Sequence, residues 1–428
     1  MLIHEASHKP NAKMRRFLRR VSCFVLVLAF AVSASLLPRA EAQEEKPVIH
    51  AGYRTLSSSL PSERLMLHMG VWYPTLRRPG SVKVGDWSFR AARNAPILAG
   101  PWPVIVLSHD ITGHAWAHHD IAAALARRGF IVAAPTHDHD NGDDMRMLFS
   151  DRELPLRAAQ LRAALDMVLE HKQIGPQADA SRVGYLGFGL PAPAGLLLAG
   201  ATLDAGGWQR FVQERHSLGE KNQAPVSPWL QPYVARRMDA LVEAMRHRAE
   251  ERREKTAMLS RASASREKQF QRLGDSLSRA HQRQIRLAQA ADIPQPPAVL
   301  PLLPPLSHDH AVTDERFAAF ALVSPGYSML FSPQSLAPVS SPIFIAGAGR
   351  DAFNLPAEQA ERLTAMFASR PFYILLPDAD MAAFHSRGPA GDAARPLGGV
   401  YDSRQSSISS QNILLDSLQE FFSSSFAR

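Results

Sequence analysis

Apolar positions along the chain fall into two regions in which short strand-like runs alternate with longer helical patterns. Across residues 51–203, apolar and β-branched runs predict strands at 65–73, 104–108, 130–134 (ended by Pro135) and 183–186, and apolar spacings of three and four predict helices at 121–128 and 156–170. The same signals return at 317–323, 343–346 and 372–376 for strands, and at 356–369 and 410–422 for helices. Alternating strands and amphipathic helices predict an α/β fold, with a mostly parallel central sheet and helices on both faces.

The stretch between these two regions, residues 205–312, has a different pattern. Residues 233–291 are rich in Arg, Glu, Gln, Ala and Met, and their apolar positions recur at helical spacing, which predicts helices. A stiff proline-rich stretch, 294–305, leads back to the second sheet region. We therefore expect two parts of one body, 43–204 and 313–428, interrupted by a helical basic insertion or cap at 205–312.

The first 42 residues have the pattern of a secretory signal peptide. A basic stretch precedes an apolar run from 21 to about 37, and Ala40-Glu41-Ala42 follows as a small-x-small cleavage site. The alternative is an uncleaved anchor, but the run is short for a bilayer span, which needs about 20 residues. The pattern predicts export, most naturally to a periplasm, with no transmembrane segment left after cleavage.

Cysteine content and charge narrow the function classes. Cys23 is the only cysteine and lies in the predicted signal peptide, so the mature chain would have neither a disulfide nor a thiol nucleophile. The net charge of +8 comes mainly from the signal peptide and from residues 236–286, which carry fourteen Lys/Arg against seven Asp/Glu. The rest is slightly acidic, which argues against a nucleic-acid partner. The basic segment is either a solvated helical hairpin or a surface attracted to an anionic envelope membrane.

Residues 183–191, Val-Gly-Tyr-Leu-Gly-Phe-Gly-Leu-Pro, have the pattern of an apolar strand, a tight turn and the start of a helix. A G-x-S-x-G nucleophile elbow has this pattern, with its serine at the tip of a strained turn. In this chain the serine position is Gly189 and the last glycine is Pro191. Glycine accepts the strained dihedral angles freely but has no side chain that could attack an ester.

Several further segments resemble one family of enzymes. They are 70–75 (GVWYPT), 95–109 (with PVIVLSH at its end), 126–135 (ARRGFIVAAP), 314–326 and 342–356. Together they resemble the predicted dienelactone hydrolases related to platelet-activating-factor acetylhydrolase, a branch of the α/β-hydrolases. The resemblance covers most of residues 50–203 and 313–385. It implies an α/β-hydrolase fold, a Ser–His–Asp triad, a backbone oxyanion hole, ester or lactone substrates, and no cofactor.

The resemblance also shows where this chain departs from the family's site. Of the triad, only the acid is retained, at Asp351, because Gly189 occupies the serine position and Met381 the histidine position. The family's oxyanion loop, HGxxG, falls on residues 109–113, where Asp110 replaces the first glycine. The implied pocket is formed by five residues: His109, Asp110, Gly113, Gly189 and Leu190.

Acyl transfer needs a nucleophile and a base within hydrogen-bond reach of it, and neither glycine nor methionine supplies one. A carboxylate at position 110 would also oppose the negative charge that develops in an oxyanion hole. The sequence therefore predicts a pseudoenzyme of ester-hydrolase ancestry that binds an unidentified small ester-like ligand or a protein partner.

Two alternatives keep the protein catalytic. In the first, relocated residues form a new triad, with Ser108 as nucleophile, His385 as base and Asp351 as acid. In the second, the His- and Asp-rich loops bind a metal ion that activates water, with His109, His137 and His139 as candidate ligands. No recognised metal-ligand spacing, such as H-E-x-x-H, supports the second alternative.

Overall fold

The computed structural model describes residues 47–60, 65–204, 206–207, 312–386 and 404–427, except positions 86, 112, 143, 145–146, 148–151 and 352–353. The predicted signal peptide and almost all of the predicted insertion lie outside the described residues. Among the described residues, no helix is both long enough and apolar enough to cross a bilayer.

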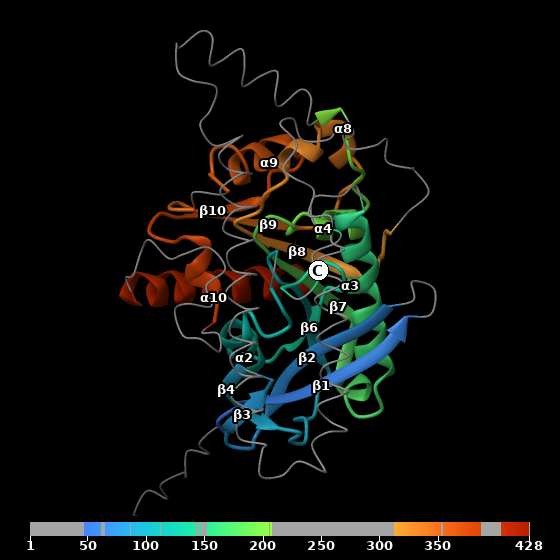
Figure 1. Cartoon of the computed structure of the whole chain (residues 1–428), viewed down its shortest axis with the longest axis vertical. Helices are drawn as coiled ribbons and strands as arrows, with labels where there is room; N and C mark the ends of the chain where they lie inside the picture. Colours follow the sequence, from blue (N-terminus) through green and yellow to red (C-terminus); the bar gives the residue numbers. More distant parts are fainter. Residues whose placement is uncertain are drawn as a thin grey trace, which may run out of the picture. The chain divides into compact units, whose positions relative to one another are not determined.

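The described chain forms one ten-stranded sheet with helices on both faces (Figure 1). The strands are β1 (His50–Leu60), β2 (Leu65–Thr75), β3 (Gly80–Val84), β4 (Trp87–Arg93), β5 (Trp102–Ser108), β6 (Ile131–Thr136), β7 (Ala178–Phe188), β8 (Phe317–Val323), β9 (Ile343–Ala348) and β10 (Phe372–Leu376). The α-helices are α2 (His119–Arg127), α3 (Glu153–Glu170), α4 (Ala194–Leu198), α8 (Pro333–Leu336), α9 (Ala360–Met366) and α10 (Arg404–Phe426).

The strand order is β10-β9-β8-β7-β5-β6-β2-β1-β4-β3. The six strands from β10 to β6 pair in parallel, and β2 is antiparallel both to β6 and to β1. Strands β7 and β8, which flank the predicted insertion in sequence, are direct neighbours, with Gly184 opposite Ala319. The predicted mostly parallel sheet is confirmed.

Alternating side chains of the central strands enter two separate cores. Ile105 and Leu107 of β5 point into a cluster with α2 and α10, whereas Val104 and Val106 point into one with α3, α4 and α9. Figure 1 accordingly shows α2 and α10 to the left of the central strands and α3 to the right. Because both faces of these strands are buried, their sequences are continuous apolar runs.

Several predicted boundaries differ from the observed ones. The strand predicted at 183–186 is the longer β7, and the helix predicted at 410–422 is the longer α10. Pro135 does not end its strand but lies inside β6, opposite Met69 of β2. The parallel ladder between β5 and β6 ends at Ala133, so a residue without an N–H is tolerated beyond it. The helix predicted at 356–369 is the shorter α9, because residues 356–359 form turns and Phe367 is extended.

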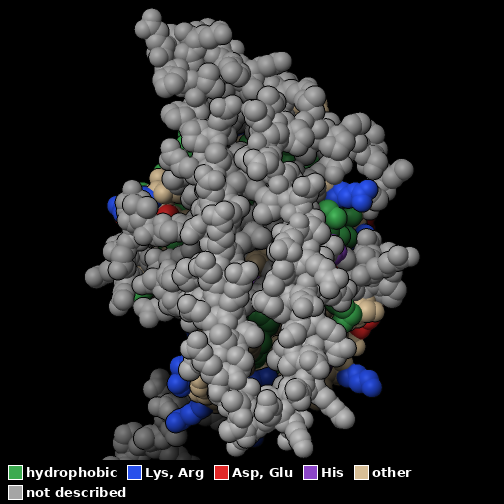
Figure 2. Space-filling model, viewed as in Figure 1, with side chains coloured by type: hydrophobic (Ala, Val, Ile, Leu, Met, Phe, Trp, Pro, Cys, Tyr) green, Lys and Arg blue, Asp and Glu red, His purple; other side chains and the backbone are tan. Residues whose placement is uncertain are grey.

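The strands at the far end of the sheet carry exposed cations. Arg77, Arg78, Lys83, Arg90 and Arg93 are all exposed and lie on or beside β2, β3 and β4. Lys and Arg side chains are visible near the lower end of the described surface in Figure 2, where Figure 1 shows these strands. Strands β3 and β10 are the two ends of the strand order, so these cations lie at the opposite end of the sheet from β9 and β10.

Candidate functional site

The turn after β7 has the backbone of an elbow with glycine at its tip. Gly189 has a φ of 68°, in the left-handed region that glycine occupies without steric cost. Its N–H donates to the carbonyl oxygen of Val323 at 2.9 Å, and its own carbonyl accepts from the N–H of Ala192 at 3.0 Å. These bonds hold the turn against β8 and lead the chain into α4.

The carboxylate of Asp110 fills the space in front of this turn. Its Oδ1 accepts hydrogen bonds from the backbone N–H of Ile111 at 2.7 Å and from that of Leu190 at 3.1 Å. A Cβ placed on Gly189 would overlap Cγ and Oδ1 of Asp110 and lie 2.7 Å from its Oδ2. Any side chain at position 189 would therefore collide with this carboxylate.

The two N–H donors come from loops that follow neighbouring parallel strands. Ile111 follows β5 and Leu190 follows β7, and these strands pair directly, with Ser108 opposite Gly187. In α/β-hydrolases, an oxyanion hole uses the N–H of the residue after the nucleophile and one from the loop after an adjacent strand. The Ile111 and Leu190 donors have this arrangement, and a carboxylate oxygen of the same chain occupies it.

Gly113 and His109 shape the loop that carries Asp110. The N–H of Gly113 donates to the carbonyl oxygen of Asp110 at 3.0 Å, and a Cβ at this position would lie 2.8 Å from Nδ1 of His109. His109 Nδ1 lies 2.6 Å from the same carbonyl oxygen. A tight turn with glycine at its end thus directs the Asp110 side chain toward the elbow.

Asp351 follows β9, is buried, and accepts hydrogen bonds with both of its carboxylate oxygens. Its Oδ2 accepts from the hydroxyl of Ser324 at 2.6 Å and from the amide of Asn354 at 3.1 Å, and its Oδ1 accepts from the N–H of Asn354 at 3.0 Å. Ser324 has a φ of 46°, an uncommon backbone conformation for a residue with a side chain. The sequence located Asp351 near the site but gave no signal for this pair of partners.

Met381 begins a short 3-10 helix, η3 (Met381–Phe384), and is buried in the apolar cluster that contains Phe188 and Ala348. Two imidazoles lie beside this segment: His385 follows it directly in the chain, and His118 contacts its last residue, Phe384. The His118 ring stacks on Phe188 at 3.9 Å between centroids and lies 5.0 Å from the ring of His385. Its Nδ1 is 2.8 Å from the carbonyl oxygen of Phe384, whereas its buried Nε2 has no hydrogen-bond partner.

Ser108 belongs to a different, buried network. Its Oγ lies 2.9 Å from Nε2 of His137, whose Nδ1 lies 3.0 Å from Oε1 of Gln160. Arg157 donates to the same Oγ at 3.2 Å and is paired with Asp140 at 2.5 Å. Ser108 is 0% exposed and bonds with His137 and Arg157. Asp351 bonds with Ser324 and Asn354, and the ring of His385 lies beside that of His118.

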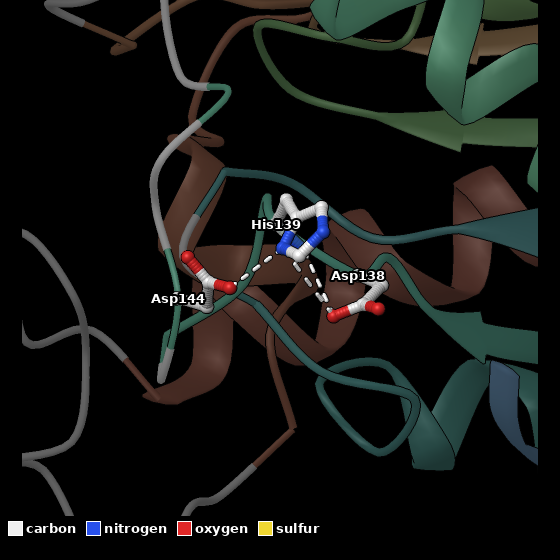
Figure 3. Close-up of side chains that lie close together, drawn as sticks. All are labelled: Asp138, His139 and Asp144. Atoms are coloured by element: carbon white, nitrogen blue, oxygen red, sulfur yellow. Dashed lines mark hydrogen bonds and ion pairs between the residues drawn. The ribbon is translucent and has the colours of Figure 1, made fainter. Parts of the chain in front are cut away.

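Two of the three candidate metal ligands use their ring nitrogens elsewhere. Nε2 of His109 accepts from the N–H of His137 at 3.0 Å, and its Nδ1 faces the Asp110 carbonyl. His137 uses both nitrogens as described above. The third candidate, His139, lies with Asp138 and Asp144 in the one group among the described residues that could hold an ion (Figure 3). Its Nδ1 is 2.7 Å from Asp144 and 3.7 Å from Asp138.

Burial controls the protonation of the three inner histidines. Loss of solvent lowers the pKa of His109, His118 and His137 well below the usual range for histidine, and the charge of Arg157 adds to this for His109 and His137. All three are therefore neutral at pH 7. Burial alone would lower the pKa of Arg157, but the charge and hydrogen bond of Asp140 outweigh it and raise that pKa.

The mostly parallel sheet, the glycine-tipped elbow after β7 and the two converging N–H donors define the class of protein: an α/β-hydrolase fold. The dienelactone hydrolase family model matches residues 89–207, a segment that contains both Asp110 and Gly189. Over this segment the chain is similar to the dienelactone hydrolase family, the resemblance that its sequence predicts.

The chain was also compared with solved structures and with curated proteins. A solved structure described as ferulic acid esterase from Streptomyces cinnamoneus is similar to this chain, with 16% sequence identity, a TM-score of 0.49, and coverage of 89% of this chain and 91% of that one. No curated protein matches the sequence.

Proposed function

We propose that this protein descends from a carboxylic ester or lactone hydrolase, no longer performs acyl transfer, and acts as an exported binding or scaffold protein. The observation that carries the proposal is the Asp110 carboxylate, which takes both the volume of a nucleophile at position 189 and the two backbone donors beside it. Support for export comes from the sequence of the first 42 residues.

Three parts of the acyl-transfer machinery would be lost together. Gly189 offers no nucleophile, and Met381 offers no nitrogen that could take a proton at the position expected for the base. The donors that would stabilise a tetrahedral oxyanion, each worth about 3–4 kcal/mol in a transition state, already bind a carboxylate. A substrate carbonyl would have to displace that carboxylate before it could be polarised.

The retained acid position supports the same proposal. In a triad, the acid accepts a hydrogen bond from the base and so orients it. Both oxygens of Asp351 instead accept bonds from Ser324 and Asn354. We propose that Asp351 now serves to hold the loops after β8 and β9 together. We further propose that the protein needs no cofactor, and that its ligand is a small ester-like molecule or a protein partner.

The test is the turnover of p-nitrophenyl acetate by the purified protein without its first 42 residues. We expect a rate no higher than that of the Asp351→Asn variant and of an unrelated protein at equal concentration. A positive control is the triple variant Asp110→Gly, Gly189→Ser, Met381→His, which returns the three missing groups. Turnover by the unmodified protein that Asp351→Asn abolishes would overturn the proposal.

A further inference from the structure

We propose that the Ile111 and Leu190 N–H groups form a retained binding site for a carboxylate, and that Asp110 fills this site as an intramolecular ligand. This inference goes beyond the proposed function, because it concerns what the pair of donors binds and not whether the protein hydrolyses esters. It assigns a ligand class, small monocarboxylates, and a residue that keeps them out.

The first argument is the convergence of two donors on one oxygen. The N–H groups belong to loops after different strands, and both point at Oδ1 of Asp110, at 2.7 and 3.1 Å. One of the two donors is 80 positions away in sequence, so the match is a tertiary feature and not a local turn. Hydrogen bonds from N–H groups to an ionised acceptor are about twice as strong as neutral ones.

The second argument is burial. Asp110 is 3% exposed, and a carboxylate taken out of water is costly unless hydrogen bonds compensate for the lost hydration. The same holds for the donors, because each buried N–H left without an acceptor costs about 1–3 kcal/mol. Donors and carboxylate therefore stabilise each other, and removing the carboxylate leaves two N–H groups in need of an anionic or carbonyl oxygen.

The third argument is shape. The carboxyl group lies where a side chain of residue 189 would begin, so the absence of a Cβ at Gly189 makes room for it. With Asp110 shortened to glycine, the space freed is that of one CH₂ and one carboxyl group, which is the size of acetate. Formate and acetate are therefore the probes whose size matches the space that the Asp110 side chain fills.

Because Asp110 is tethered next to the donors, it competes with any free anion at a high effective concentration. The unmodified protein should therefore bind acetate at this position far more weakly than a variant without the carboxylate. The same competition would keep the acid product of an ester out of the site.

The experiment measures acetate and formate binding by calorimetry and by the thermal shift of the full chain, with sodium chloride at equal ionic strength as the salt control. We expect Asp110→Gly to bind acetate saturably, about tenfold or more tightly than the unmodified protein. Asp110→Asn keeps an oxygen in the site and is the matched control, for which we expect no gain. Equal acetate binding by Asp110→Gly and the unmodified protein would overturn the proposal.

A second measurement does not require the glycine variant to fold. In ¹H–¹⁵N spectra, we expect the amide signals of Ile111 and Leu190 to shift together in Asp110→Asn, since both N–H groups lose a charged acceptor. Shifts confined to Ile111, the chain neighbour of the substitution, would contradict the shared site. Alkylation of Asp110 by a small alkyl halide would also overturn the proposal, because it would make this carboxylate a nucleophile and not a bound ligand.

Discussion

Gly189 and Asp110 share one small volume, so neither residue can be understood without the other. The left-handed φ of Gly189 is usable by a serine in an active elbow, at a strain of about 1–3 kcal/mol. Here the added obstacle is the Asp110 carboxyl group, which already occupies the position of a Cβ. A side chain at position 189 and the carboxylate at position 110 therefore compete for the same space.

This competition predicts non-additive stabilities. We expect Gly189→Ser to lower the free energy of unfolding by about 2–4 kcal/mol, because overpacking adds to backbone strain. In the Asp110→Gly background the same substitution should cost at least about 1 kcal/mol less, since the collision is gone. Urea denaturation of the four proteins in this cycle measures the difference, and equal costs in both backgrounds would contradict the shared volume.

Ser324 combines a favourable bond with an unfavourable backbone conformation. Its hydroxyl donates to the buried Asp351 carboxylate at 2.6 Å, and its φ of 46° is strained for any residue except glycine. We expect Ser324→Ala to lower the free energy of unfolding by about 2–3 kcal/mol, because a charged acceptor loses a donor. Ser324→Gly loses the same bond but relieves the strain, so it should be about 1 kcal/mol less harmful. Chemical denaturation of both variants tests this, and a glycine variant less stable than the alanine one would refute it.

At the level of elements, α3 is attached to the loops after β5 and β6 by one buried cation. Arg157 of α3 bonds to Asp140, to Oγ of Ser108 and to the carbonyl oxygen of His109 at 2.6 Å. Both members of the Arg157–Asp140 pair are almost fully buried. This contact fixes the loop that carries Asp110, and so connects the packing of a helix to the geometry of the candidate site.

We expect Arg157→Met to lower the free energy of unfolding by about 3–5 kcal/mol, because it leaves the Asp140 carboxylate buried without its cation. The matched control is Arg128→Met, which breaks the exposed ion pair with Asp416 on α10 and should cost less than about 1 kcal/mol. Thermal or urea unfolding of the two variants gives the comparison. Similar losses of unfolding free energy in the two variants would show that the buried ion pair contributes no more to stability than the exposed one.

The elements also show which sequence signals were sufficient. The strands at 317–323 and 372–376 were predicted with their observed bounds, because short apolar runs between turn residues leave little choice. Strands β1, β3 and β4 were not individually predicted, since they are mostly polar or mixed and gain their order from pairing with β2 and with each other. Pairing between segments is a tertiary property that no local pattern encodes.

The sequence predicted which residues belong to the region of the site, but not the contacts between their side chains. The elbow motif and the altered oxyanion loop placed Gly189 and Asp110 in one region. That the Asp110 side chain enters the turn after β7 depends on the register of β5 against β7, which places Ser108 beside Gly187. The hydrogen bonds of Asp351 with Ser324 and Asn354, and the packing of His118 against Phe188, could not be predicted from the sequence.

At the scale of the whole molecule, buried neutral histidines should make stability depend on pH. The pKa values of His109, His118 and His137 are lowered in the folded protein, so between those values and about pH 6.5 the unfolded chain binds more protons. Stability is then fully present above about pH 6.5 and is lost as the pH falls. Each histidine contributes a slope of up to about 1.4 kcal/mol per pH unit.

Urea unfolding between pH 7.5 and pH 5.5 measures this slope. In the His118→Phe variant, which keeps an aromatic ring against Phe188, we expect the total loss of stability over this pH interval to be smaller by up to about 1.4 kcal/mol, the contribution of one histidine. A free energy of unfolding that stays constant down to pH 5.5 would show that these groups accept protons without opposing the fold.

The central claim is that the elbow has lost its acyl chemistry, and reaction with a fluorophosphonate probe tests it most directly. Intact-mass spectrometry of the purified protein after incubation with the probe counts the covalent adducts. The account predicts an unchanged mass for the protein as it exists, and one adduct, on residue 189, for the variant with Asp110→Gly, Gly189→Ser and Met381→His. A stoichiometric adduct on any serine of the unmodified protein, lost in Asp351→Asn, would contradict it.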